Sequence, residues 1–157
     1  MSIDRVRKYL KRFGADEKIH EFDVSSATVE LAAEAIGTEP ARICKTISFK
    51  TPSGCLLVQA AGDTKIDNRK FKDFFGFKAK MLTAEEVVEY TGYKIGGVCA
   101  FDVQREDVEV YADISLKRFD IIYPACGSAN SMIPLTCEEL ADFTDIKAWI
   151  DVCKLRK

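Results

Sequence analysis

A lysine within an otherwise apolar strand is the first candidate for chemistry. The stretch ICKTISFKT, residues 43–51, alternates its side chains as a β-strand alternates its two faces. This period places Lys45 on the same face as Ile47 and Phe49, where a core is expected. Two interpretations are open. Either the ammonium group reaches an edge while its aliphatic stem packs, or it lies at a pocket rim and orients an anionic or carbonyl group.

Two glycine-containing loops are candidates to share a site with that strand. Gly96 and Gly97 form one loop, and the segment ACGSANS, residues 125–131, contains the other. Glycines allow backbone amides to approach a ligand oxygen and donate hydrogen bonds to it, because no Cβ intervenes. Each loop taken alone is equally compatible with an ordinary tight turn. The prediction of a shared site therefore rests on the three segments together.

The sequence lacks the common hydrolytic and nucleotide-binding motifs. Its single histidine, His20, cannot be placed beside a serine or cysteine, and there is no G-x-S-x-G motif, P-loop or dinucleotide fingerprint. The six cysteines form no C-x-x-C pair, so neither a metal nor another cofactor is expected. Cys126 has no identifiable base, which favours a buried thiol over a nucleophile.

Composition and charge favour one domain without a membrane segment. The chain has 157 residues, of which 47% are hydrophobic and 31% charged, and it has no apolar run of about 20 residues. The N-terminus does not resemble a secretory signal, so we expect a cytoplasmic protein with a single domain over residues 1–157. Although the net charge is only −2, basic residues are concentrated in the first twelve residues and at 65–80. These could meet a polyanion or form ordinary solvated helix faces.

The elements that must position these segments are short helices and strands. Helices are predicted over residues 3–13, 25–37 with a serine N-cap, 66–76 with Asp67 or Asn68 as the cap and Gly76 as the end, 83–92, 136–143 and 145–155. Strands are predicted over residues 18–24, 43–51, 55–62, 108–113, 119–127 and 131–135, and the turn TPSG joins the second and third into a hairpin. Helices that interrupt short strands without a regular repeat favour a mixed α/β domain with a curved sheet.

A resemblance to a known family is carried by four segments, in this order: ICKTISF, GDTKIDNRKFKDFFGFKAKMLTAEEV, TGYKIGGVCAFD and FDIIYPACGSANSMIPLTCEEL. Together they resemble the YbaK family of aminoacyl-tRNA deacylases, relatives of the editing domain of bacterial prolyl-tRNA synthetases. The resemblance spans nearly the whole chain and implies a barrel-like mixed sheet flanked by helices. It further implies an enzyme that hydrolyses in trans the ester of a mischarged small amino acid, of the alanine or cysteine class, on proline tRNA. The implied partners are aminoacyl-tRNA and prolyl-tRNA synthetase, with no cofactor, membrane or DNA.

The resemblance also implies roles for individual residues. The residues implied in catalysis are Lys45, which would contact the phosphate or sugar at the 3′ end of the tRNA, Gly96 and Gly97. The implied substrate-binding residues are Thr46, Ala100, Gly127, Ser128, Asn130 and Ser131. The residues expected to face tRNA on the basic surface are Arg5, Lys8, Arg12 and Lys70. Because an aminoacyl ester is already activated, backbone donors and orientation could suffice without a protein base.

Two positions depart from the family pattern. Ala100 stands where the family usually has proline, and Asp102 where a glycine often follows. The departure puts the size of the amino-acid pocket in question. It also keeps an alternative function open, a non-catalytic module on the same fold that binds tRNA or a synthetase.

Overall fold

A long β-hairpin forms the centre of the protein. The computed structural model describes residues 2–156, and in it β2 (Ile43–Thr51) pairs antiparallel with β3 (Gly54–Ala61). The register sets Lys45 opposite Ala60 and Phe49 opposite Leu56. Nearly all of β3 is buried, which fits its almost continuous apolar sequence. The predicted hairpin is confirmed.

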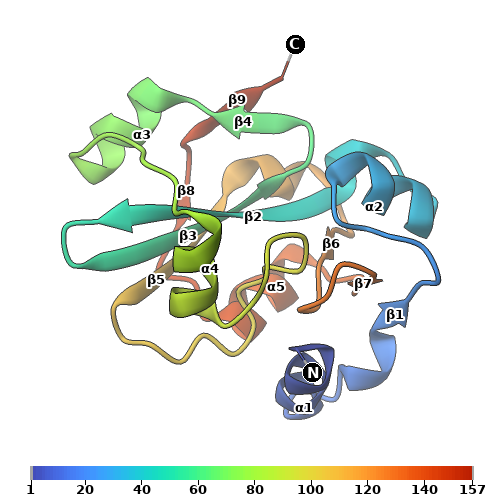
Figure 1. Ribbon diagram of the computed structural model, residues 1–157. Helices are drawn as coiled ribbons and strands as arrows, with labels where there is room; N and C mark the ends of the chain where they lie inside the picture. Colours follow the sequence, from blue (N-terminus) through green and yellow to red (C-terminus); the bar gives the residue numbers. More distant parts are fainter. Residues whose placement is uncertain (1, 157) are drawn as a thin grey trace.

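The hairpin belongs to a five-stranded mixed sheet with the order β6-β2-β3-β5-β8 (Figure 1). The other three strands of this sheet are β5 (Val108–Asp113), β6 (Tyr123–Pro124) and β8 (Trp149–Ile150). β6 runs parallel to the start of β2, β5 parallel to β3, and β8 parallel to β5. Two antiparallel pairs complete the strands: β1 (His20–Glu21) with β7 (Ser131–Met132), and β4 (Thr64–Ile66) with β9 (Cys153–Leu155).

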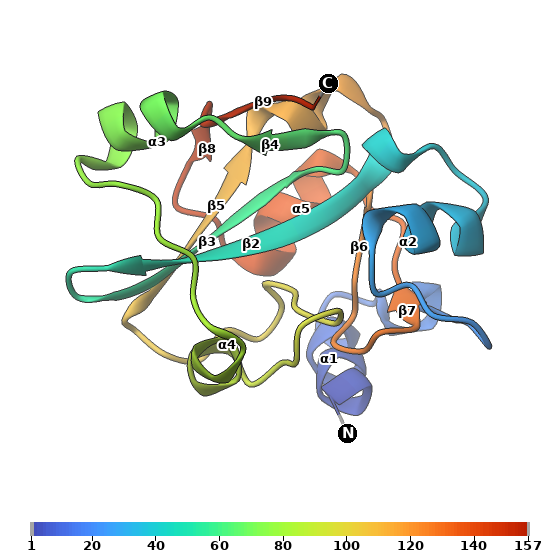
Figure 2. The same cartoon turned by 45° about the horizontal axis from the view of Figure 1, so that its top comes forward.

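Five α-helices and three short 3-10 turns connect these strands. The helices are α1 (Ser2–Lys11), α2 (Val29–Ile36), α3 (Asn68–Phe75), α4 (Ala84–Thr91) and α5 (Cys137–Thr144), and the turns are η1 (Asp16–Lys18), η2 (Pro40–Arg42) and η3 (Ile114–Arg118). Figures 1 and 2 place α3 with the β4–β9 pair on one side of the hairpin and α1 on the other. Among residues 2–156, none of the helices has the length and apolar character of a membrane span. The predicted mixed α/β architecture, a mixed sheet flanked by helices, is confirmed.

Local capping explains where most helices begin. Thr83 and Thr136 each form a capping box with a glutamate three residues later, as the sequence predicts. The serine N-cap predicted for α2 is wrong, because the hydroxyl of Thr28 accepts the hydrogen bond from Leu31 N–H and the helix begins at Val29. Ser25 and Ser26 are therefore left in the loop that precedes the helix.

Both faces of the hairpin are covered by apolar side chains. On one face, Cys44 and Ala61 belong to the cluster that includes Leu10 of α1 and Leu140 of α5. On the other face, Phe49 and Leu56 pack with Phe71 of α3 and with Val152 near the C-terminus. Lys45 lies on this second face, as the alternation predicts.

The C-terminal segment differs from its prediction. Residues 145–155 contain β8 and β9 rather than a helix. Tertiary pairing decides this outcome: Val152 N–H donates to the Asp113 carboxylate at 2.9 Å, and Val152 O accepts from Asp67 N–H at 2.8 Å. The strands predicted at 18–24, 119–127 and 131–135 are each only two residues long in the structure. The strand β4 was not predicted, because three residues are too few to show a periodic pattern.

Candidate functional site

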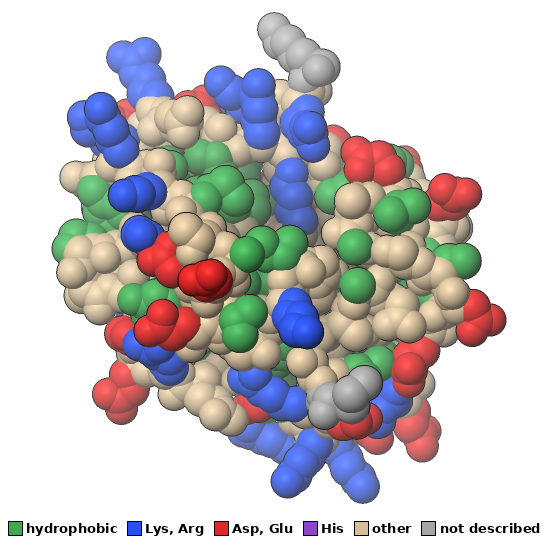
Figure 3. Space-filling model, viewed as in Figure 1, with side chains coloured by type: hydrophobic (Ala, Val, Ile, Leu, Met, Phe, Trp, Pro, Cys, Tyr) green, Lys and Arg blue, Asp and Glu red, His purple; other side chains and the backbone are tan. Residues whose placement is uncertain are grey.

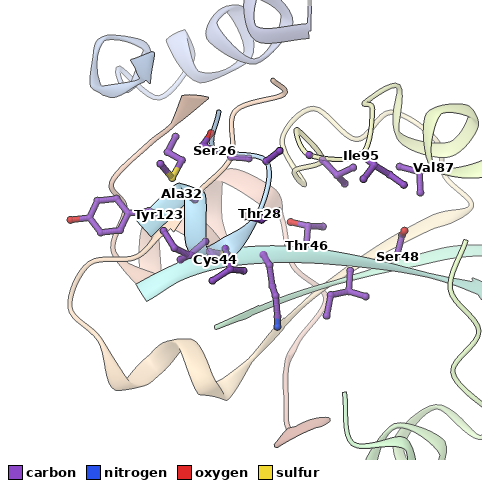
Figure 4. Close-up of a pocket in the computed structure, with 18 of the residues that line it drawn as sticks. Ser26, Thr28, Ala32, Cys44, Thr46, Ser48, Val87, Ile95 and Tyr123 are labelled. Carbon is purple, nitrogen blue, oxygen red and sulfur yellow. The ribbon is translucent and has the colours of Figure 1, made fainter. Parts of the chain in front are cut away.

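A cavity of about 290 Å³ beside β2 is the candidate site (Figure 4). Its walls come from β2, from the loop that precedes α2, from the Gly96 loop and from the segment between Tyr123 and Met132. The side chains labelled in Figure 4 are Ser26, Thr28, Ala32, Cys44, Thr46, Ser48, Val87, Ile95 and Tyr123. Among the described residues that line it, none is acidic and one, Lys45, is basic. The cavity therefore suits a small group without positive charge.

The edge of β2 opposite β3 has a gap in its strand pairing beside the cavity. β6 covers the start of this edge. Farther along, Leu82 N–H donates to Ser48 O at 3.2 Å and Lys50 N–H donates to Lys80 O at 2.8 Å. Backbone groups alternate sides along a strand, so the N–H and C=O of Thr46 point toward this same edge. Within residues 2–156 the pairing with β6 ends at Cys44 and the contacts with residues 80 and 82 begin at Ser48, so no strand pairs with this edge at Thr46.

Lys45 lines the same cavity but is anchored away from it. Its ammonium group donates to the backbone oxygen of Thr64. Burial lowers the pKa of Lys45, and the nearby positive charge of Arg156 lowers it further. The side chain thus has a partly buried stem beside the cavity and an ammonium group held at the backbone of β4. Its contact with a substrate stays a prediction.

The two glycine loops pack against each other, as a shared site requires. Gly96 lines the cavity with a φ of 97°, in the left-handed region that favours glycine. A Cβ added at Gly97 would lie 2.7 Å from the backbone nitrogen of Ser128, closer than packed atoms approach. Glycine at position 97 therefore permits the close contact between the loops.

The predicted polar residues of the second loop form a network behind the cavity. Ser128 Oγ lies 2.9 Å from Asn130 Oδ1 and 2.6 Å from Ser131 Oγ. Asn130 Nδ2 donates to Phe22 O at 2.9 Å, which ties this loop to the segment that precedes α2. None of Gly127, Ser128, Asn130 and Ser131 is among the residues that line the cavity. They support its walls.

The two positions that depart from the family pattern also lie outside the cavity lining. Ala100 is 2% exposed and packs in a cluster with Leu82 and Val87, beneath the cavity wall. Asp102 has a φ of 57° and pairs with Arg5, with an Nε–Oδ2 distance of 2.8 Å. Of the predicted catalytic and binding residues, the structure brings Lys45, Thr46 and Gly96 to the cavity.

The basic residues predicted to face tRNA differ in their surroundings. Lys8 on α1 and Arg12 directly after this helix are exposed. Lys70 is also exposed, and it pairs with Asp151 at 3.0 Å. The side chain of Arg5 is 28% exposed and engaged within the protein. The role of all four toward tRNA stays a prediction.

Several lining residues were missed by sequence reasoning. They are Ser26, Ala27, Thr28, Ile95, Tyr123 and Met132. The one sequence signal for this group is the pair of serines before α2, which predicts a helix cap. In the structure Thr28 caps the helix, and Ser26 is buried among the residues that line the cavity.

No activated thiol is found at the cavity among the described residues. Burial raises the pKa of Cys44, the one cysteine among those that line it, so its thiolate is strongly disfavoured. Cys126 is fully buried and its pKa is raised for the same reason. Ester chemistry at this cavity would therefore depend on backbone donors and on orientation rather than on a protein nucleophile.

Comparison with solved structures finds another protein that shares this fold over nearly its whole length. A provisionally assigned trans-editing enzyme for prolyl-tRNA synthetase has a TM-score of 0.86 and 28% identity, with 98% of this chain and 97% of that chain covered.

Sequence comparison finds relatives of two kinds. A protein of Bacillus subtilis (strain 168) described as uncharacterized, YwhH, is 52% identical over 155 residues, which is 98% of each chain. The proline–tRNA ligase of Exiguobacterium sibiricum is 25% identical over 130 residues, and the match covers 83% of this chain but 22% of the ligase. The model of the aminoacyl-tRNA editing domain matches residues 23–143. This match contains β2, both glycine loops and the whole lining of the cavity. The chain belongs to the aminoacyl-tRNA editing domain family.

Proposed function

We propose that the protein is a trans-editing deacylase that hydrolyses the ester of a mischarged small amino acid, of the alanine or cysteine class, on proline tRNA. The observation that carries this proposal is the position of Thr46 on the wall of a cavity of about 290 Å³, at a stretch of the β2 edge with which no strand pairs among the described residues. Family membership supports the reaction class, and the relatives among proline–tRNA ligases support the choice of tRNA.

The geometry supports hydrolysis through electrostatic stabilisation of the transition state. Attack on the ester carbonyl places negative charge on its oxygen, and we assign the backbone N–H of Thr46, which lines the cavity, as the donor for that charge. Gly96 lies on the wall of the same cavity, where the backbone can approach the ester closely. Removing one such donor in other enzymes costs about 100- to 1,000-fold in rate, so backbone donors are a sufficient source of catalysis.

The size and polarity of the cavity support a small amino acid. Ala27, Ala32 and Ala125 contribute short side chains to its lining, with Ile43 and Met132 as larger apolar neighbours. The lining offers no carboxylate among the described residues, so a basic side chain would have no counter-charge. A basic side chain would therefore be disfavoured by desolvation.

A basic surface beside the cavity supports tRNA as the carrier of the ester. Lys65 and Lys154 are directly opposite each other in the β4–β9 pair, and both are exposed. Like charges in this arrangement are destabilising unless an anion lies near. Arg156 continues β9 toward Lys45. Figure 3 shows Lys and Arg side chains gathered over α3 and the β4–β9 pair. Phosphates of a tRNA acceptor end would offset this repulsion.

Deacylation of a panel of charged tRNAs tests the proposal. Proline tRNA would be charged with alanine, cysteine, serine or proline and incubated with wild-type protein or with Lys45→Ala. The expected result is rapid release of a non-cognate small amino acid, retention of proline, and loss of release in the variant. If tRNA binds and every ester decays at its spontaneous rate, the non-catalytic binding module is the correct function.

A further inference from the structure

The turn between β3 and β4 holds the ammonium group of Lys45. Lys45 Nζ donates to the backbone oxygen of Thr64, the first residue of β4. This oxygen is a neutral acceptor, and an ammonium group has three N–H donors. The contact therefore fixes the Lys45 side chain without neutralising its charge, and donors remain for an anionic or carbonyl oxygen of a substrate.

A carboxylate lies beside this contact. Asp63 directly precedes Thr64 in the chain. Burial is the main cause that lowers the pKa of Lys45, and the negative charge of Asp63 acts in the opposite direction. An ion pair between Asp63 and Lys45 would compete with a substrate for the ammonium group. Yet none of the ion pairs within residues 2–156 includes Lys45.

Arg118, at the end of η3, holds the Asp63 carboxylate. Arg118 Nη1 lies 3.0 Å from Asp63 Oδ2, and Arg118 Nη2 lies 2.6 Å from Asp63 Oδ1. Arg118 Nε donates to Ser115 O at 2.8 Å, which fixes the guanidinium itself. These hydrogen bonds lower the pKa of Asp63, burial opposes them, and the charge of Lys45 adds to the lowering. Both carboxylate oxygens thus face Arg118 in a bidentate pair.

The backbone of this turn is fixed independently of Arg118. Arg156 N–H donates to Asp63 O at 2.9 Å, and Thr64 Oγ1 donates to Ala61 O at 2.7 Å. A Cβ at Gly62 would collide with the backbone oxygen of Pro40, so the turn is packed closely against η2. Loss of the Arg118 side chain would therefore leave the Asp63 carboxylate beside Lys45 rather than release the turn.

The other titratable groups that affect Lys45 do so less directly. Arg156 is positive and repels the ammonium group. Glu30 is the second carboxylate near Lys45 among the described residues, but it is exposed on α2 and its effect is smaller than that of Asp63. Burial raises the pKa of the Cys153 thiol to about 12, so it is neutral. Asp63 is therefore the main competitor for Lys45.

We propose that Arg118 is a positioning residue for the reaction: it holds both oxygens of the Asp63 carboxylate and so prevents an ion pair that would withdraw Lys45 from the substrate. This inference rests on the proposed function. The side chains of Arg118 and Asp63 are 39% and 33% exposed, and pairs in such surroundings contribute little to stability. The pair acts by directing the charge of Asp63 away from Lys45.

The test compares wild type with Arg118→Ala, with the double variant Arg118→Ala/Asp63→Asn, and with Arg42→Ala. Arg42 is the matched control because it lies near the same aromatic ring: the guanidinium groups of Arg42 and Arg118 lie 5.0 Å and 4.8 Å from the centre of the Phe119 ring. Arg42 also pairs with an aspartate, Asp120, at 2.7 Å. Asp120 is not among the groups that affect Lys45 within the described part of the chain.

Deacylation is measured on the non-cognate ester of proline tRNA that wild type hydrolyses fastest. Arg118→Ala should lower kcat/KM by about 10-fold or more, because Asp63 then holds Lys45 away from its productive position. The double variant should regain nearly the wild-type kcat/KM, because asparagine has the shape of aspartate without its charge. Arg42→Ala should equal wild type. The melting temperatures of all three variants should stay close to that of wild type.

An NMR titration of ¹³C-labelled lysine side chains reports on Lys45 directly, with Lys45→Met identifying its signal. The pKa of Lys45 should rise in Arg118→Ala, because a carboxylate without its arginine favours the charged lysine, and it should return in the double variant. A merely structural role of Arg118 would not produce this rise and its reversal.

Three results would overturn the inference. They are a wild-type kcat/KM in Arg118→Ala, an unchanged pKa of Lys45 in that variant, and a double variant as impaired as Arg118→Ala, since Arg118 would then act through a contact other than Asp63. If wild type hydrolyses no ester at all, it is the proposed function that fails, and the NMR titration still supports or overturns the capture of Lys45 by Asp63.

Discussion

Arg5 and Asp102, which are 97 positions apart in the chain, form an ion pair that fastens α1 to the glycine loop. Arg5 Nε lies 2.8 Å from Asp102 Oδ2, Arg5 Nη1 donates to Thr91 O at 3.0 Å, and the guanidinium lies 4.5 Å from the centre of the Tyr93 ring. These contacts hold both ends of the segment that carries Gly96. Asp102 adopts a φ of 57°, which aspartate tolerates better than most residues. The position that departs from the family pattern thus provides an anchor.

Arg5→Ala should reduce deacylation and stability together, because it removes several hydrogen bonds to a partly buried guanidinium. We expect a loss of about 1–3 kcal/mol in the free energy of unfolding. Arg5→Lys keeps the charge but cannot form the fork of hydrogen bonds, so it should recover only part of the loss.

A double-mutant cycle with Asp102→Gly isolates the pair. Glycine relieves the left-handed conformation and removes the carboxylate, and its effect should be non-additive with that of Arg5→Ala by about 0.5–3 kcal/mol. Urea unfolding measures all three variants. Simple addition of the two single effects would show that the pair does not fasten the loop.

Lys45→Met should leave the protein at least as stable as wild type while abolishing deacylation. Methionine keeps the packing of the stem and removes a partly buried charge. Burial lowers the folded-state pKa of Lys45 below its ordinary value, so the unfolded state binds more protons between those two values. Wild-type stability should therefore rise with pH through that window relative to the variant. Urea unfolding from neutral pH to about pH 10 measures the difference, and a constant difference contradicts the interpretation.

Gly97→Ala should impair deacylation by separating the two glycine loops. The added methyl would lie 2.7 Å from the backbone nitrogen of Ser128, so one loop must move. Gly76→Ala is the matched control, because Gly76 caps α3 with a φ of 82° and a Cβ there meets no atom within 4 Å. Both variants should lose about 1 kcal/mol or more of stability, but only Gly97→Ala should lose activity. Equal activity in the two variants would show that the contact between the two loops does not contribute to deacylation.

Binding of tRNA should weaken as salt rises, and the β4–β9 surface should carry part of that dependence. Replacing Lys65 and Lys154 with glutamine removes two charges that face each other across the pair. Each lost phosphate contact should lower the slope of log K against log salt by about 1. The double variant should also be more stable, because the repulsion between the two lysines is gone. An unchanged salt slope would place tRNA on another face, with Lys8 of α1 and Arg12 directly after it as the next candidates.

Local sequence signals predicted many of the strands, turns and helix starts of the fold. The alternation in residues 43–51, the turn after it and the two threonine capping boxes each depend on neighbours along the chain, and all were confirmed. The helix predicted over 145–155 failed because its helical spacing is overridden by pairing with β4 and β5, which are distant in sequence.

The same distinction between local and long-range signals applies to the candidate site. Lys45 and Gly96 were predicted from strand period and loop composition, which are local, and Thr46 from the family resemblance; all three line the cavity. Ser26, Ile95 and Met132 were missed because their place at the cavity depends on how four separate segments fold together. The pair formed by Arg5 and Asp102 joins two segments far apart in the chain, and neither residue type predicts it alone.

The most direct test of the central claim is multiple turnover on one substrate. Proline tRNA charged with radiolabelled serine or alanine, in large excess over protein, would be followed for free amino acid under conditions in which the ester is otherwise stable. We predict that each protein molecule releases many amino acids and that Lys45→Ala releases them no faster than buffer. Protection of the ester, or decay at the spontaneous rate with saturated tRNA binding, would contradict the account and identify a binding module.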